Sequence, residues 1–101
     1  MRIIEKLSDR IEDEIQDAKN YTLLALEIRD EFPDVARILY TISLQEMEHM
    51  RMIHDGVTAI IAQYRDENGE PPAKMMAVYE YLHKKHIENA ADAKIVQSMY
   101  K

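Results

Sequence analysis

In two long stretches of this chain, mostly apolar residues recur at intervals of three and four positions. This spacing is typical of a helix that packs along one side. In the first stretch the series is Ile4, Leu7, Ile11, Glu14, Ala18, Tyr21, Ala25, Ile28 and Phe32, and in the second it is Leu39, Ile42, Glu46, His49, Ile53, Val57, Ile60 and Tyr64. Pro33 stands between them, and the residue before a proline is pushed out of helical angles. The pattern predicts two long helices, over about residues 2–32 and 34–67, that fold back on each other as an antiparallel hairpin.

A third helix is predicted over about residues 73–100. Asn68-Gly69 is a signal for the end of a helix, and Pro71-Pro72 separates the second helix from the third. The apolar face of the third segment carries Met75, Tyr79, Leu82, His86, Ala90, Ala93 and Tyr100. With 101 residues, few glycines and prolines and many good helix formers, the chain is expected to be a single all-α domain over residues 1–101.

The composition excludes several classes of protein. There is no cysteine, so neither a disulfide framework nor a thiolate metal site can form. The net charge of −6 argues against nucleic-acid binding, which needs clustered Lys and Arg, and suits the attraction of cations. No apolar run is long enough to span a membrane, and the first residues show no secretory signal pattern. A soluble, cytoplasmic protein without membrane or nucleic-acid partners is expected.

Three polar residues occupy positions in the two apolar series: Glu14, Glu46 and His49. Charged side chains are rarely buried unless they are paired or bind a metal. Glu46 and His49 stand three residues apart and therefore project from the same side of their helix. Carboxylate and imidazole ligands suit iron, manganese or zinc. We therefore predict that these three residues are metal ligands.

The predicted ligands amount to half of a known set. A dinuclear carboxylate site in a four-helix bundle takes one Glu from each of two helices and a Glu-x-x-His pair from each of the other two. The hairpin supplies one Glu and one Glu-x-x-His pair. Two copies related by a twofold axis would supply the whole set. The prediction is therefore a four-helix bundle completed by homodimerisation, with the metal site at the subunit interface.

The run from Glu14 to Tyr21, followed by Gln45-Glu46-Met47-Glu48-His49, resembles the first helix pair of the ferritin-like superfamily, nearest to rubrerythrin-type proteins, over roughly residues 4–64. The resemblance implies a dinuclear iron site with Glu14 as a terminal or bridging carboxylate, Glu46 as a bridging carboxylate and His49 as a terminal ligand. It also implies oxidation of ferrous iron by O2 or H2O2, that is, ferroxidase or peroxidase-like activity.

The chain also departs from that family's pattern. It lacks the rubredoxin-like cysteines of true rubrerythrins, and it is about half their size. It is more similar to encapsulated ferritins, in which a two-helix subunit completes its site by dimerising, so a location inside a protein compartment is an alternative to the open cytoplasm. Higher homo-oligomers built from the dimer are a further expectation.

The main alternative is a structural helical adaptor in which the polar residues set the register of the helices. Glu80 and His83 repeat the Glu-x-x-His spacing and are candidates for a second half-site, and His86 is either a further ligand or a core histidine. Asp17 either hydrogen-bonds a metal ligand or is solvated, and Tyr21 is expected to pack in the core. A zinc hydrolase is disfavoured because the His-Glu-x-x-His pattern is missing.

Overall fold

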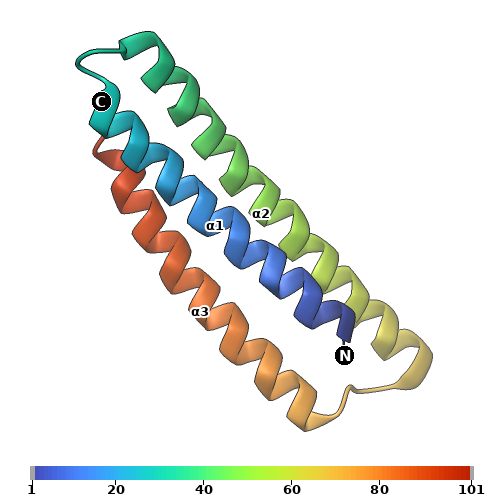
Figure 1. Ribbon diagram of the computed structural model, residues 1–101. Coiled ribbons are helices and arrows are strands. Elements are labelled where there is room, and N and C mark those ends of the chain that lie inside the picture. The colour runs from blue at the N-terminus through green and yellow to red at the C-terminus, as the bar shows by residue number, and fades with distance from the viewer. Residues whose placement is uncertain (1, 101) are drawn as a thin grey trace.

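The computed structural model describes residues 2–100, which form three helices and no strand: α1 (Arg2–Ile28), α2 (Pro33–Asn68) and α3 (Ala73–Ser98) (Figure 1). The helices lie side by side in a rod of 56 × 18 × 18 Å, with α1 between α2 and α3 (Figure 1). The prediction of an all-α fold built on a long helical hairpin and a third helix is confirmed. No described helix is both long enough and apolar enough to cross a bilayer.

The first helix ends at Ile28, earlier than the sequence pattern indicated. The Ile28 carbonyl accepts hydrogen bonds from the backbone N–H groups of Glu31 and Phe32, at 3.2 and 2.7 Å, and these bonds close a turn. Phe32 has non-helical angles (φ −130°, ψ 68°) and is 52% exposed, so it extends neither the helix nor its buried face. Pro33 then opens α2, where its lack of an N–H costs nothing.

The second and third helices end at the expected signals. Gly69 follows α2 with a φ of +79°, a value that favours glycine, and its N–H donates to the Arg65 carbonyl at 3.0 Å. Pro71 and Pro72 form the connection, and α3 starts at Ala73. Helix α3 ends at Ser98, slightly before the predicted position.

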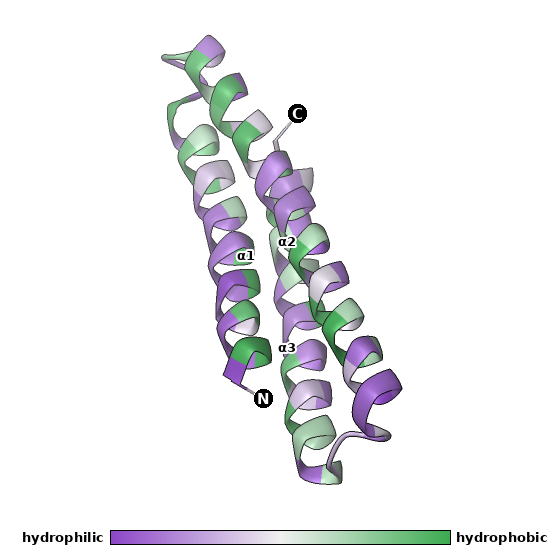
Figure 2. Ribbon diagram, turned by 90° about the vertical axis from the view of Figure 1, so that its right-hand side faces the viewer, coloured by the Kyte–Doolittle hydropathy of each residue, from purple (hydrophilic) through white to green (hydrophobic). Residues whose placement is uncertain are grey.

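The core lies along α1, which packs against both of the other helices. In Figure 2, apolar and polar bands alternate along α1 and α2, as amphipathic helices require. The buried apolar cluster consists of Ile4, Ile11, Ile15, Val57, Ile61, Ala90 and Ala93. Helix α1 therefore holds the molecule together, while α2 and α3 meet each other at a few places.

A buried hydrogen-bond network joins all three helices at one point. The Ser43 hydroxyl of α2 donates to the Ala18 carbonyl of α1 at 2.6 Å. It accepts a bond from the Thr22 hydroxyl at 2.7 Å and another from the Gln97 amide of α3 at 2.8 Å. Thr22 and Ser43 are fully buried. Because every partner is satisfied, the network specifies one register for the three helices.

The residues of α2 that are buried against α1 differ in part from the predicted series. Its fully buried residues are Ala36, Ser43, Val57 and Ile61, whereas most of the predicted series is half-buried. Small side chains at positions 36 and 43 let the two helices approach closely. As a result, Glu46 and His49 lie at the edge of the contact between α1 and α2, not at its centre.

Candidate metal centre

The structure brings Glu14, Glu46 and His49 together across the hairpin. One ligand atom from each side chain lies within 4.8 Å of the others. The His49 Nδ1 atom is 3.3 Å from the Glu14 Oε2 atom and 3.7 Å from the Glu46 Oε1 atom. Glu14 comes from α1, and Glu46 and His49 come from one turn of α2. The antiparallel hairpin therefore brings residues that are far apart in the sequence to the same level along its axis.

The Glu14 side chain opposes the ionisation of Glu46. The pKa of Glu46 is raised from 4.5 to about 7, first by its hydrogen bond to the Glu14 side chain, then by burial and by the negative charges of Glu14 and Asp17. The nearby His49 acts in the opposite direction. Glu46 therefore holds a proton near neutral pH, and a cation placed between the carboxylates would displace that proton.

The cluster is open on one side. Side-chain exposure is 17% for Glu46 and 23% for Glu14, but 53% for His49. The cluster also points away from α3. Glu12 on α1 accepts hydrogen bonds from Asn89 of α3 at 3.1 Å, and Glu14 lies two residues further on, about 200° around the helix. The open side is therefore the face of the hairpin that α3 leaves free.

The donor set fits a first-row transition metal. Ligand atoms bonded to one such ion lie about 2.0–2.2 Å from it, and therefore up to about 4.4 Å from each other. The spacing of up to 4.8 Å in the cluster is close to this and needs only small side-chain rotations. Two carboxylates and one imidazole nevertheless leave an ion short of ligands, and further ligands can reach it only from the open side.

Other sequence candidates occupy separate places. Asp17 is near enough to Glu46 for its charge to raise the pKa of that carboxyl, and Tyr21 is half-buried. On α3, the His83 ring stacks on the His54 ring of α2, with centroids 4.7 Å apart, and His86 is a buried core histidine at 8% exposure. Among the described residues, Glu80, His83 and His86 do not join a second cluster of three ligands.

Sequence reasoning missed the pairing of His54 with His83. His54 lies outside the apolar series of α2, and nothing in the spacing of α2 indicates that α3 covers it. A signal was nevertheless present in α3, where His83 and His86 stand three apart on the apolar side of the helix.

The helical hairpin with a carboxylate–imidazole cluster defines the class of this protein as a helical-bundle protein with a candidate metal centre. A family model described as Rubrerythrin matches residues 5–101, which include most of α1 and the whole of α2 and α3. The chain belongs to the rubrerythrin family, and its fold is ferritin-like. Comparisons with curated proteins and with solved structures found no match.

Proposed function

We propose that two copies of this chain bind a pair of iron ions between them and oxidise ferrous iron with O2 or H2O2. Glu14, Glu46 and His49 of each copy would hold the metal. The observation that carries the proposal is the convergence of these three side chains, with ligand atoms within 4.8 Å, at an open edge of the hairpin. Membership of the rubrerythrin family supports iron as the metal.

The exposure of the cluster supports a site shared between subunits. One chain offers three ligand residues, whereas a dinuclear carboxylate site of this type needs six. Exposed apolar side chains continue from the cluster towards the N-terminal end of α2, where Val35 is 47% and Ile38 is 59% exposed. Val35, Ile42 and His49 recur at intervals of seven, so they lie along one side of α2. A second hairpin packed there would bury apolar surface and complete the ligand set.

The side chains have distinct roles in the proposal. Glu46 carries a proton near neutral pH and releases it when a cation binds, which keeps the charge at the site balanced. Glu14 contacts both other residues and can bind from α1, which joins the two helices of the hairpin through the metal. Bound iron supplies one-electron redox chemistry between the ferrous and ferric states, with O2 or H2O2 as the oxidant.

A purely structural adaptor is less well supported. Polar residues that set the register of a helical bundle are buried and paired with each other, and the Ser43 network already does this here. His49 is more than half exposed, so it does not serve that purpose within one chain.

The test is an anaerobic titration of metal-free protein with ferrous iron, followed by exposure to O2, with mass measured by sedimentation velocity. We expect saturation at about one iron per chain, a mass of two chains, and oxidation faster than in buffer. Glu46→Gln should abolish saturable binding and leave the helical content unchanged. Glu48→Gln is the matched control, because Glu48 pairs with Arg51 outside the cluster. Equal binding by Glu46→Gln and the native protein would overturn the proposal.

A further inference from the structure

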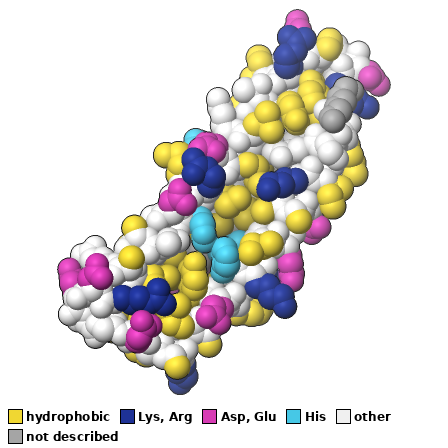
Figure 3. Space-filling model, turned by 180° about the vertical axis from the view of Figure 1, so that it is seen from behind, with side chains coloured by type: hydrophobic (Ala, Val, Ile, Leu, Met, Phe, Trp, Pro, Cys, Tyr) yellow, Lys and Arg dark blue, Asp and Glu magenta, His cyan; other side chains and the backbone are white. Residues whose placement is uncertain are grey.

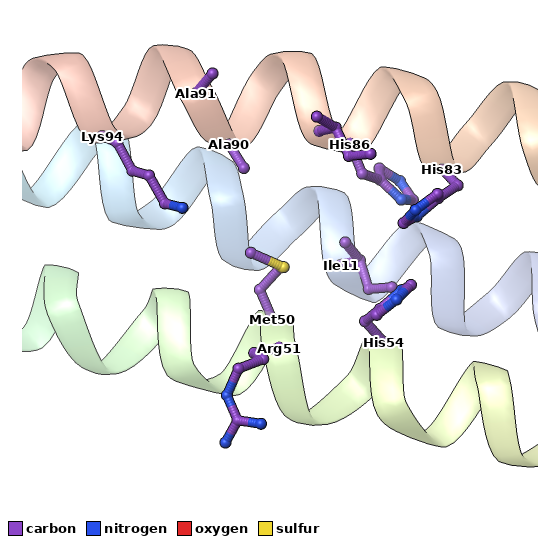
Figure 4. Close-up of a pocket in the computed structure, with 10 residues that line it drawn as sticks. Ile11, Met50, Arg51, His54, His83, His86, Ala90, Ala91 and Lys94 are labelled. Carbon is purple, nitrogen blue, oxygen red and sulfur yellow. The ribbon is translucent and has the colours of Figure 1, made fainter.

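A cavity of about 350 Å³ lies between α2 and α3, and none of the three residues of the metal cluster lines it. Figure 3 shows histidine side chains beside exposed apolar side chains on the back of the molecule. The floor of the cavity is Ile11 of α1, and its apolar walls include Met50 of α2 and Ile87, Ala90 and Ala91 of α3. In Figure 4, Met50 and Lys94 point into the space between the helices from opposite sides. The two alanines leave room where larger side chains would close the gap. A volume of this size falls in the range of small-molecule sites.

The cavity is bounded at both ends by contacts between α2 and α3. At one end, Gln97 donates to Ser43 at 2.8 Å, and beyond it the rings of Tyr40 and Tyr100 stack with centroids 4.4 Å apart. At the other end, the rings of His54 and His83 stack at 4.7 Å. Along α2, the stretch from Ser43 to His54 is roughly 16 Å long. These bridges keep a partner helix from lying along the floor, so a compact ligand fits this cavity better than a protein segment does.

The titratable residues that line the cavity are all bases, although the chain carries a net charge of −6. They are Arg51, His54, His83, His86 and Lys94. Arg51 is already paired with Glu48 and Asp55. Burial lowers the pKa of His83 and of His86, so both are neutral at pH 7 and can act as hydrogen-bonding groups. Glu12 lies beside His86, with 3.9 Å between the nearest atoms.

Lys94 is the uncompensated charge of the cavity. Within the described residues it has no ion-pair partner, and the positions three and four residues away on α3 hold Ala90, Ala91, Gln97 and Ser98, none of which is acidic. An ammonium group at the edge of an apolar cavity attracts an anion whose remaining surface is apolar.

We propose that this cavity binds a small amphipathic carboxylate, with the carboxylate on Lys94 and an apolar body between Met50 and the Ala90–Ala91 wall. The apolar body is an aliphatic chain or a fused aromatic ring, and either would bind through the same apolar contacts. This site is independent of the metal site, because Glu14, Glu46 and His49 do not line it.

The test is calorimetric titration of metal-free full-length protein at pH 7.5 with decanoate and with 2-naphthoate. Saturable binding of one molecule per chain is expected for at least one of them, and the tighter of the two identifies the apolar body. For the tighter probe, the neutral amide of the same acid should bind about tenfold more weakly, which is about 1.4 kcal/mol, because it lacks the charge that pairs with Lys94. Lys94→Met should weaken binding of the carboxylate about tenfold and leave binding of the amide unchanged.

Three further variants make the test specific. Ala90→Leu should weaken binding by filling the cavity, because Ala90 points into the space between the helices (Figure 4), with its helical content checked by circular dichroism. Lys84→Met is the matched control, because it removes the same charge from α3 outside this cavity, and it should bind like the native protein. Glu46→Gln should also bind normally, which separates this site from the metal site. The proposal is overturned if neither carboxylate saturates, or if Lys94→Met and Lys84→Met weaken binding equally.

Discussion

Glu46 is the residue whose protonation controls the candidate metal centre. With its pKa raised to about 7, it is mostly protonated below pH 7 and mostly ionised above it. A cation must displace that proton to bind, so metal affinity should fall as the pH falls. We expect the dissociation constant for Mn²⁺ to be nearly constant above about pH 7.5 as far as this group is concerned, and to rise about tenfold for each pH unit below 7. Electron paramagnetic resonance of free Mn²⁺ measures this directly.

In the metal-free protein, the raised pKa of Glu46 makes the folded state less stable as the pH rises, whereas metal affinity increases as the pH rises. A carboxyl group whose folded-state pKa is raised contributes stability below its ordinary value of 4.5, and this contribution is lost as the pH rises through about 7. Metal-free Glu46→Gln should therefore gain stability relative to the native protein between pH 5 and pH 8. A pH-independent Mn²⁺ affinity between pH 6 and pH 8 would contradict this account of Glu46.

Ser43 is the residue on which the register of the three helices depends. Replacing it with alanine removes the partner of Thr22 and Gln97 and leaves two polar groups unpaired in the interior. We expect Ser43→Ala to lower the free energy of unfolding by about 1–3 kcal/mol. Urea denaturation measures this change. Thr41→Ala, which alters an exposed hydroxyl on the same helix, should change stability by less than about 0.5 kcal/mol. Equal effects of the two substitutions would show that the network adds nothing.

At the scale of the elements, the two glycines allow opposite predictions. Gly56 lies inside α2, and a Cβ atom added there would have no neighbour within 4 Å. Gly56→Ala should therefore raise the free energy of unfolding of the single chain by about 1 kcal/mol, because alanine is the better helix former. Gly69 has a φ of +79°, so Gly69→Ala should lower it by about 1 kcal/mol.

Thermal or urea unfolding at a protein concentration low enough to keep the chain monomeric distinguishes the two glycine substitutions. A loss of stability in monomeric Gly56→Ala would contradict the prediction, because no atom lies within 4 Å of the added Cβ in the single chain. Gly56 follows His49 by seven residues and therefore lies on the same side of α2. A loss of stability that appears only at concentrations at which the chain dimerises would locate a close contact between subunits on the face that carries the metal cluster.

At the scale of the whole molecule, the exposed apolar face beside the metal cluster should control assembly. Ile38 is 59% exposed and lies about three turns before His49 on the same side of α2. Ile38→Lys should abolish dimerisation and weaken ferrous binding by at least tenfold, although no ligand residue has changed. Sedimentation velocity and iron titration of the same sample measure both effects. Ile95→Lys, at an exposed position of α3, is the control and should remain dimeric.

The two proposed binding faces of the molecule are separate for a reason of geometry. Helix α1 contacts α2 on one side and α3 on another (Figure 1). The hairpin of α1 and α2 therefore has one face that α3 leaves free and one face that α3 partly covers, and the groove between α2 and α3 lies on this second face (Figure 3). A dimer formed through the free face would leave the cavity near Lys94 accessible. If Ile38→Lys abolished carboxylate binding as well, the two faces would not be independent.

The sequence by itself determined the three helices and the grouping of the ligands. The helices follow from local signals, namely the spacings of three and four, Pro33 and Asn68-Gly69. Each of these signals depends only on backbone angles or on one face of one helix. The hairpin then brings Glu14 towards Glu46 and His49, because a short connection forces the helices to be antiparallel. The early end of α1 was not predicted, because the turn that precedes Pro33 uses residues that also fit the helical spacing.

The tertiary structure alone decided which line of each helix is buried and how α3 is placed. A spacing of three and four defines a broad apolar stripe, but the line of closest contact within it depends on the small side chains Ala36 and Ser43. That choice leaves His49 exposed and ready for a ligand set from outside the chain. The stacking of His54 on His83 and the cavity beside Lys94 depend on contacts between α2 and α3. No local pattern encodes these contacts, because each helix only specifies its own face and not its partner.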